Sequence, residues 1–342
     1  MALLRSLLKS FALTLLAGYG WLRIRFVNEP TLLILTYHRI LPSDAPERSS
    51  EQPGMITTPE LLDQHIDLVK RLGAEPVHLD NWIERKNSKK SLPRLAVAFT
   101  FDDGWRDNFQ YAYPKLEAQR VPATIFLVTQ LIDTERTFWP EQILRLLTSE
   151  SGKIDESGHQ WLAPYLKEGK ESSLPLPLDK ADEVISRLKA LPDETIYSLL
   201  DETEVESRSN PHSTRDRSIL SKQEVLKMAE SGLVKFGAHT RNHYRLNLLN
   251  EQTTLHAEIV DCFEDMKTFG NSSIPIFCYP NGNITARGEE LVRQTYEAAC
   301  TTKTGWNRAS LTDQFELHRF NLHDGNSFSA MRFLATIGRG IL

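Results

Sequence analysis

Two adjacent carboxylates and a pair of histidines are the residues of this chain whose types and spacing best suit chemistry. Asp102 and Asp103 follow the apolar run LAVAFTF, residues 95–101. Carboxylates at the end of a buried strand need a partner, because an unpaired buried charge is costly. His239 and His243 follow the strand-like run VKFGA. Two imidazoles four residues apart face the same way if the chain between them makes a helical turn.

Together these side chains would form an open metal site. Two histidines and one carboxylate leave a fourth position free, which is typical of catalytic rather than structural zinc. The HxxxH spacing alone is weak, because a zincin would need glutamate where Thr240 stands. Gly104 would let the chain turn so that both aspartates face one site. One aspartate would then bind the metal, and the other would take a proton from metal-bound water, whose pKa the cation lowers to about 7.

The elements that must position these residues alternate between strands and helices. The strand-like runs are 31–38, 95–101, 123–128, 234–238, 275–280, 296–302 and 314–322, and the helix-like runs are 57–73, 106–120, 221–232, 250–270 and 286–294. This alternation predicts an α/β fold with a parallel sheet. Catalytic residues of such folds lie at the carboxyl ends of the strands, where the aspartates and histidines stand. The polar segment at about 140–215 is predicted to be a helical insertion.

Composition limits the class of protein. The 342 residues include 40% hydrophobic and 25% charged residues, as expected of a globular protein. A net charge of −5 and the lack of a basic, aromatic-rich block argue against a nucleic-acid partner. Three widely spaced cysteines without a CxxC pair predict neither a disulfide framework nor a thiolate zinc site, and they fit a reducing compartment.

The N-terminal segment, residues 1–26, is basic and apolar, and the first acidic residue of the chain is Glu29. Its uninterrupted apolar run, 11–22, is shorter than the roughly 20 residues that a membrane span needs. Two interpretations remain: a helix lying in the membrane interface, or an export signal or single span. The expected organisation is therefore this segment followed by one catalytic domain over 27–342.

Three motifs occur in a fixed order: TFDDG (100–104), HTRNH (239–243) and CYPNG (278–282). Over roughly residues 30–340, outside the insertion, the chain resembles the NodB-type polysaccharide deacetylases, carbohydrate esterase family four. The resemblance implies a distorted (β/α) barrel and a divalent metal, most often Zn²⁺. It also implies hydrolysis of the N-acetyl group of an amino sugar by metal-bound water.

The same resemblance assigns roles to individual residues. It implies that Asp102 is the general base and that the backbone N–H of Tyr279 stabilises the oxyanion. The metal ligands that it implies are Asp103, His239 and His243.

Two departures from the family pattern affect the catalytic set. The third motif of the family contains an arginine that orients the base, whereas CYPNG has none, so we expect Arg319 to replace it. The leaving amine needs a proton from a histidine. His38 is preferred, because a Tyr-His motif ahead of the aspartate pair is similar to the branch with the poly-N-acetylglucosamine deacetylases. His323 is the second candidate and His318 the third.

The expected function is removal of N-acetyl groups from an amino-sugar polysaccharide or lipid-linked glycan, in exopolysaccharide or lipopolysaccharide biosynthesis. The expected place is the bacterial inner membrane, with the cytoplasmic face preferred and a periplasmic or exported protein as alternatives. Rival functions are a deformylase or other deacylase of a lipid-linked amino sugar, a catalytically inactive carbohydrate-binding module, and a phosphodiesterase or peptidase using a similar site.

Overall fold

The computed structural model describes residues 2–52, 54–148, 159–166, 174–207, 217–249 and 251–340. The strands are β1 (Thr31–Tyr37), β2 (Arg39–Ile40), β3 (Ile56–Thr57), β4 (Glu75–Pro76), β5 (Leu95–Phe101), β6 (Ala123–Leu127), β7 (Val234–Ala238), β8 (Ser273–Cys278), β9 (Ala298–Cys300), β10 (Asn307–Arg308) and β11 (Phe320–Asn321). The α-helices are α1 (Ala2–Phe26), α2 (Pro59–Arg71), α3 (Leu79–Asn87), α4 (Tyr113–Gln119), α5 (Trp139–Thr148), α6 (Leu178–Leu188), α7 (Asp193–Ser207), α8 (Lys222–Glu230), α9 (Gln252–His256), α10 (Cys262–Met266), α11 (Ala286–Thr295), α12 (Asp324–Ser327) and α13 (Ala330–Gly338).

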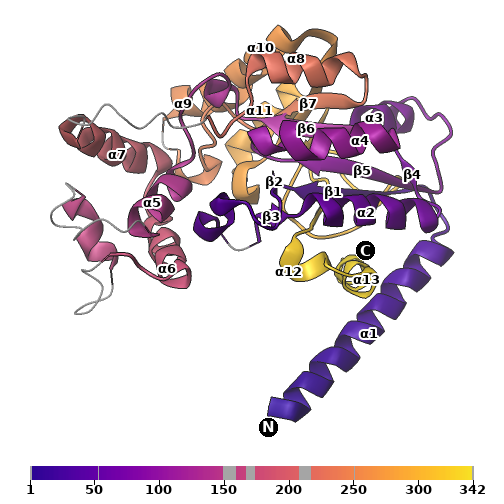
Figure 1. Cartoon of the computed structure of the whole chain (residues 1–342). Coiled ribbons are helices and arrows are strands. Elements are labelled where there is room, and N and C mark those ends of the chain that lie inside the picture. Colours follow the sequence, from indigo (N-terminus) through magenta and orange to yellow (C-terminus); the bar gives the residue numbers. More distant parts are fainter. Residues whose placement is uncertain are drawn as a thin grey trace.

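A curled, nearly parallel sheet organises the molecule (Figure 1). Its strand order is β10-β1-β5-β6-β7-β8-β9, with β11 pairing with β1 and β4 pairing with β5. Only β10 runs antiparallel to its neighbour among the described pairs. This mixed α/β architecture, a half-barrel surrounded by helices, confirms the predicted fold class.

The two faces of the sheet are buried in different ways, which explains why β1 and β5 are apolar without alternation. One face packs on a layer of helices through Leu33, Val97 and Phe99. The other face carries the small side chains of Ala96 and Ala98 beside larger ones such as Phe126, and α3 packs over it.

Local signals in the sequence account for several boundaries. Thr58 caps α2 by accepting the N–H of Leu61, and Ser221 forms a capping box with Glu224 at the start of α8. Two expectations need correction. The expected strand over 314–322 is a strand only at β11, because the chain before it turns after Asp313. The expected helix over 250–270 is interrupted by a wider π-turn between α9 and α10.

Helices α5, α6 and α7 occupy the segment where an insertion is expected, and they lie together at one side of the sheet (Figure 1). They share a separate apolar cluster that includes Ile143, Val184 and Ile196. Parts of the expected segment, 149–158, 167–173 and 208–216, lie outside the described residues.

Helix α1 packs on α13 near the C-terminus and projects from the domain (Figure 1). Within the described residues, no helix combines the length and apolar character needed to cross a membrane.

Candidate active site

The chemically able residues lie where neighbouring strands end. His38 follows β1, and Asp102 follows β5. His239 follows β7, and Tyr279 follows β8. Because these strands run parallel in one sheet, their carboxyl ends meet at one edge. All four residues line a single cavity of about 400 Å³.

Three side chains converge in this cavity as a group that could hold a metal ion. The Oδ1 atom of Asp103 lies 3.4 Å from Nε2 of His239 and 3.4 Å from Nε2 of His243. Trp105 donates its indole N–H to the other oxygen of Asp103 at 2.9 Å, so Oδ1 faces the two imidazoles. One carboxylate and two imidazole nitrogens are a donor set that suits a divalent transition metal.

The backbone, rather than a helix, brings these ligands together. Asp103 has a φ of 75° and is followed by Gly104 with the same φ, so the chain turns sharply at the end of β5. Thr240 and His243 also have positive φ values, of 63° and 62°. The helical turn considered for the two histidines is therefore wrong: two left-handed residues aim both imidazoles at Asp103.

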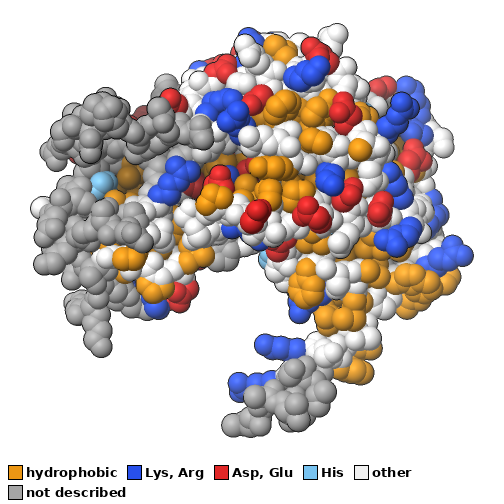
Figure 2. All heavy atoms as spheres, in the orientation of Figure 1, with side chains coloured by type: hydrophobic (Ala, Val, Ile, Leu, Met, Phe, Trp, Pro, Cys, Tyr) orange, Lys and Arg blue, Asp and Glu red, His pale blue; other side chains and the backbone are white. Residues whose placement is uncertain are grey.

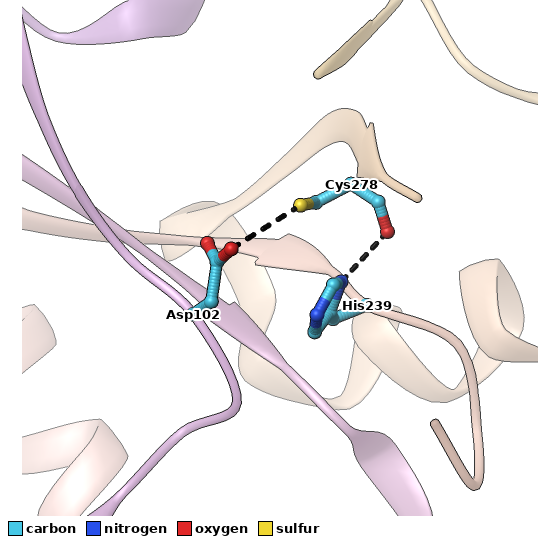
Figure 3. Close-up of side chains that lie close together, drawn as sticks. All are labelled: Asp102, His239 and Cys278. Atoms are coloured by element: carbon cyan, nitrogen blue, oxygen red, sulfur yellow. Dashed lines mark hydrogen bonds between the residues drawn. The ribbon is translucent and has the colours of Figure 1, made fainter. Parts of the chain in front are cut away.

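Cys278 contacts two members of the site (Figure 3). Its carbonyl accepts the Nδ1–H of His239 at 2.7 Å. That contact fixes the ring orientation and turns Nε2 toward Oδ1 of Asp103. Its thiol lies 3.7 Å from Oδ2 of Asp102. The residue therefore packs between the carboxylate of Asp102 and the imidazole of His239.

Asp102 is held by a buried ion pair. Arg319 donates NH1 to Oδ1 at 2.7 Å and its Nε–H to the carbonyl of Thr301 at 2.8 Å. Both charged side chains are about 97% buried, with exposures of 3% and 4%. His38 lies on the other side, with Nε2 at 3.9 Å from Oδ2. The structure therefore brings Arg319 and Asp102 together, as the positioning role expected of Arg319 requires.

The electrostatics keep both carboxylates ionised. Burial raises the pKa of Asp102, but Arg319, followed by His239 and His38, outweighs it and leaves the pKa below its usual value. Burial likewise opposes ionisation of Asp103, and the surrounding histidines still bring its pKa far down. Burial lowers the pKa of His243 to about 4, so this ring is the neutral imidazole that binds metals.

Three predicted residues do not take the expected positions. The backbone N–H of Tyr279 donates to the carbonyl of Cys300 at 3.1 Å, so it is not available to an oxyanion. His323 caps α12, accepts the N–H of Gly325 through Nδ1, and does not line the cavity. His318 does not line it either.

Asn281 offers the free backbone donor that Tyr279 lacks. It lines the cavity and has a φ of 53°. No partner for its N–H occurs within the described part of the chain. Asn281, a left-handed residue directly after Pro280, is therefore the candidate backbone donor among the residues that line the cavity.

The helices α5–α7 form one wall of the cavity. Arg245, two residues after His243, pairs with the buried Asp193, and its NH2 lies 2.9 Å from Oδ1. Its guanidinium also donates to the carbonyls of Lys189 and Leu191, at 2.5 and 2.7 Å. This network ties the loop that carries His243 to the helical wall.

The same wall carries a buried acid. Glu141 lies in the first turn of α5, is 4% exposed and lines the cavity. Its Oε2 has no hydrogen-bond partner within the described residues. Burial, with Glu51 and Asp103 nearby, raises its pKa well above the usual value. Burial therefore favours the neutral carboxyl over the carboxylate at this position.

Comparisons with known proteins agree with this geometry. A family model described as polysaccharide deacetylase matches residues 89–298, which is more than half of the chain. The chain belongs to the polysaccharide deacetylase family. This confirms the family resemblance, and members of this family are hydrolases of carbon–nitrogen bonds.

Individual relatives are more distant. The Bacillus subtilis (strain 168) protein YxkH, named as a candidate polysaccharide deacetylase, is 32% identical over 91 residues. That match covers 25% of this chain and only 31% of YxkH.

Solved structures extend the likeness to most of the fold. The Streptococcus pyogenes deacetylase PplD, solved in complex with acetate, matches with a TM-score of 0.58 and 18% identity over 91% of this chain and 99% of that one. IcaB from Ammonifex degensii matches with a TM-score of 0.56 and 17% identity over 90% and 97%. A de-N-acetylase from Aggregatibacter actinomycetemcomitans gives 0.55 and 17% over 89% and 99%. At these identities the structures support the fold alone.

Proposed function

We propose that this protein is a metal-dependent deacetylase that removes N-acetyl groups from an amino-sugar glycan. The observation that carries the proposal is the convergence of Asp103, His239 and His243 next to a carboxylate, Asp102, that is kept ionised by Arg319. Two carboxylates with separate partners allow separate roles, one for a ligand and one for a base.

The metal would be held by Asp103, His239 and His243, and Zn²⁺ is the ion that this donor set suits best. When bound, it supplies Lewis acidity, which polarises the amide carbonyl and lowers the pKa of water. His239 is oriented for this task by the carbonyl of Cys278.

The remaining residues move protons and stabilise charge. Asp102 accepts the proton of the attacking water, with Arg319 fixing the orientation of its carboxylate. The N–H of Asn281, in place of that of Tyr279, donates to the oxygen that gains negative charge. His38, on the cavity side of Asp102, protonates the leaving amine. Its position after β1 favours the branch with an N-terminal Tyr-His motif over one that uses His323.

The substrate class follows from the family and from the site. A cavity of about 400 Å³ accommodates one or two sugar rings. The acceptor is either a polysaccharide or a lipid-linked glycan of the cell envelope. The main alternative keeps the same residues and changes the acyl group, as in removal of a formyl group from a lipid-linked amino sugar.

The test is release of acid from a substrate panel. Zinc-loaded wild type would be incubated with N-acetylhexosamine oligomers and undecaprenyl-linked sugars, and both acetate and formate would be measured. Asp103→Ala removes a proposed ligand, and Asp44→Ala, at an exposed acid away from the cavity, is the matched control.

Acetate from wild type and control, but not from Asp103→Ala, supports the proposal, and the best substrate names the class. Formate without acetate moves the assignment to the deformylase. Neither acid, with no metal retained by the wild type, supports the inactive carbohydrate-binding alternative.

A further inference from the structure

Helix α1 carries a continuous apolar stripe that no described residue of the domain covers. The spacing of three and four residues places six large side chains on one helix face. Each of them is between 46% and 66% exposed. They are Leu8, Phe11, Leu15, Tyr19, Leu22 and Phe26. An exposed contiguous apolar surface of this kind marks an interaction site.

The opposite face of α1 is fixed to the domain, so the stripe is presented in one orientation. A side chain at Gly20 would collide with the backbone of Leu334, and one at Gly338 would collide with that of Leu16. These two glycines therefore let the backbones of α1 and α13 touch.

Polar contacts at the base of the helix strengthen this attachment. Arg23 donates to the carbonyl of Gly340 at 2.6 Å and stacks over Trp306 at 4.2 Å. Arg94 donates to the carbonyl of Ile24 at 2.9 Å. Helix α1 is thus a supported arm and not a free tail.

The basic residues of α1 indicate which kind of surface the apolar stripe binds. Arg5, Lys9 and Arg25 are exposed on α1, and no acidic residue precedes Glu29. Figure 2 shows the basic and apolar side chains together on the projecting helix. Two copies of this helix packed through the stripe would bring like charges together, whereas anionic lipid headgroups complement them. Tyr19 and Trp21 add the amphipathic rings that favour the boundary between headgroups and acyl chains.

We propose that α1, held by α13, docks the protein onto the surface of an anionic lipid bilayer. The six stripe residues enter the acyl boundary, and the basic residues contact the headgroups. Docking does not depend on the deacetylation chemistry. Helix α1 leads into the amino end of β1, whereas His38 and the cavity lie at the carboxyl end of β1.

The test is flotation of the full-length protein with vesicles of phosphatidylcholine alone or mixed equally with phosphatidylglycerol. The wild type should bind the anionic vesicles at least about tenfold better and lose that gain in roughly 0.5 M salt, because the headgroup attraction is screened. Phe11→Gln/Leu15→Gln should lower binding to anionic vesicles by at least about tenfold, since apolar area is lost. Tyr111→Gln/Leu226→Gln, at exposed apolar residues elsewhere, should bind as wild type does.

All variants should show the thermal unfolding midpoint of the wild type, which checks folding whether or not any substrate is turned over. Wild type that stays unbound with both vesicle types would overturn the proposal, as would unchanged binding of Phe11→Gln/Leu15→Gln. A dimer without lipid that is lost in this variant would assign the stripe to a second copy of the chain and also overturn it.

Discussion

Replacing Arg319 by methionine tests how the base is kept ionised. The substitution preserves most of the side-chain volume and removes the charge that lies 2.7 Å from Asp102. Both partners are almost fully buried, so the remaining carboxylate would have no compensating cation of similar strength. Breaking a buried ion pair in this way costs about 3 to 5 kcal/mol of unfolding free energy.

The pH dependence of this loss has a definite sign. In the wild type the pKa of Asp102 lies below its usual value, so the pair stabilises above the unfolded pKa and the stabilisation is lost as pH falls through the folded pKa. Without Arg319, burial raises the pKa above the unfolded value. The difference in unfolding free energy between wild type and Arg319→Met should therefore be largest near neutral pH and shrink toward about pH 4.

Activity should follow the same titration. A protonated Asp102 accepts no proton, so kcat at neutral pH should fall by about 10² to 10⁴, the range for losing a general base, while KM changes little. Raising the pH should restore part of the loss. Arg319→Lys keeps the charge but cannot hold both Asp102 and the Thr301 carbonyl, so an intermediate kcat is expected. Urea unfolding and acetate release are measured across pH. A pH–rate profile of Arg319→Met that matches the wild type would show that Arg319 does not keep Asp102 ionised.

Three further changes probe the surroundings of the site. Cys278→Ala should lower kcat severalfold and shift the pH–rate profile, because the thiol beside Asp102 is lost. The control Cys262→Ala should change only stability. Equal pH–rate profiles for the two variants would contradict this expectation. Glu141→Gln should have a higher unfolding free energy than the wild type at about pH 8 but not at about pH 5. A carboxyl whose pKa is raised by burial stabilises the folded protein at low pH, and this stabilisation is lost as the pH rises through its folded pKa. The same difference between the urea-unfolding curves of variant and wild type at both pH values would argue against a neutral Glu141. Asp193→Ala should cost about 3 to 5 kcal/mol in urea unfolding and weaken metal binding, because the buried charge of Arg245, next to the loop that carries His243, would lose its carboxylate partner. Unchanged metal affinity by calorimetry would show that the loop does not need this anchor.

The sequence was informative where chemistry follows directly from strand order. Asp102, Asp103 and His239 each come directly after an apolar strand-like run. In a parallel sheet this order is enough to predict that they meet at one edge, and they do. The position of Arg319 near the site could also be predicted, because its strand-like segment was expected to end near the same edge of the sheet.

Other features depend on packing between distant segments, and no local pattern predicts them. The pairing of Arg245 with Asp193 joins residues 52 positions apart on separate elements. The N–H of Tyr279 is taken by a neighbouring strand whose register the sequence does not specify. In the sequence, Glu141 resembles an ordinary acidic residue in the first turn of a helix. Its burial arises only when the helices of the cavity wall pack together.

The ligand geometry shows a similar limit. The spacing of His239 and His243 suggested a helical turn, whereas residues with positive φ produce the convergence. A positive φ is uncommon for residues other than glycine, and for the β-branched Thr240 no pattern in the sequence predicts it.

The central claim is that Asp103, His239 and His243 hold the metal on which deacetylation depends. The most direct measurement is zinc titration by calorimetry of chelated wild type and of His243→Ala, with acetate release recorded on the same samples. We expect one zinc per wild-type chain, with acetate release rising in proportion to the zinc added. For His243→Ala we expect weak or no zinc binding and no acetate. Acetate release from metal-free wild type, or stoichiometric zinc and full activity in His243→Ala, would show that these three residues do not hold a metal needed for deacetylation.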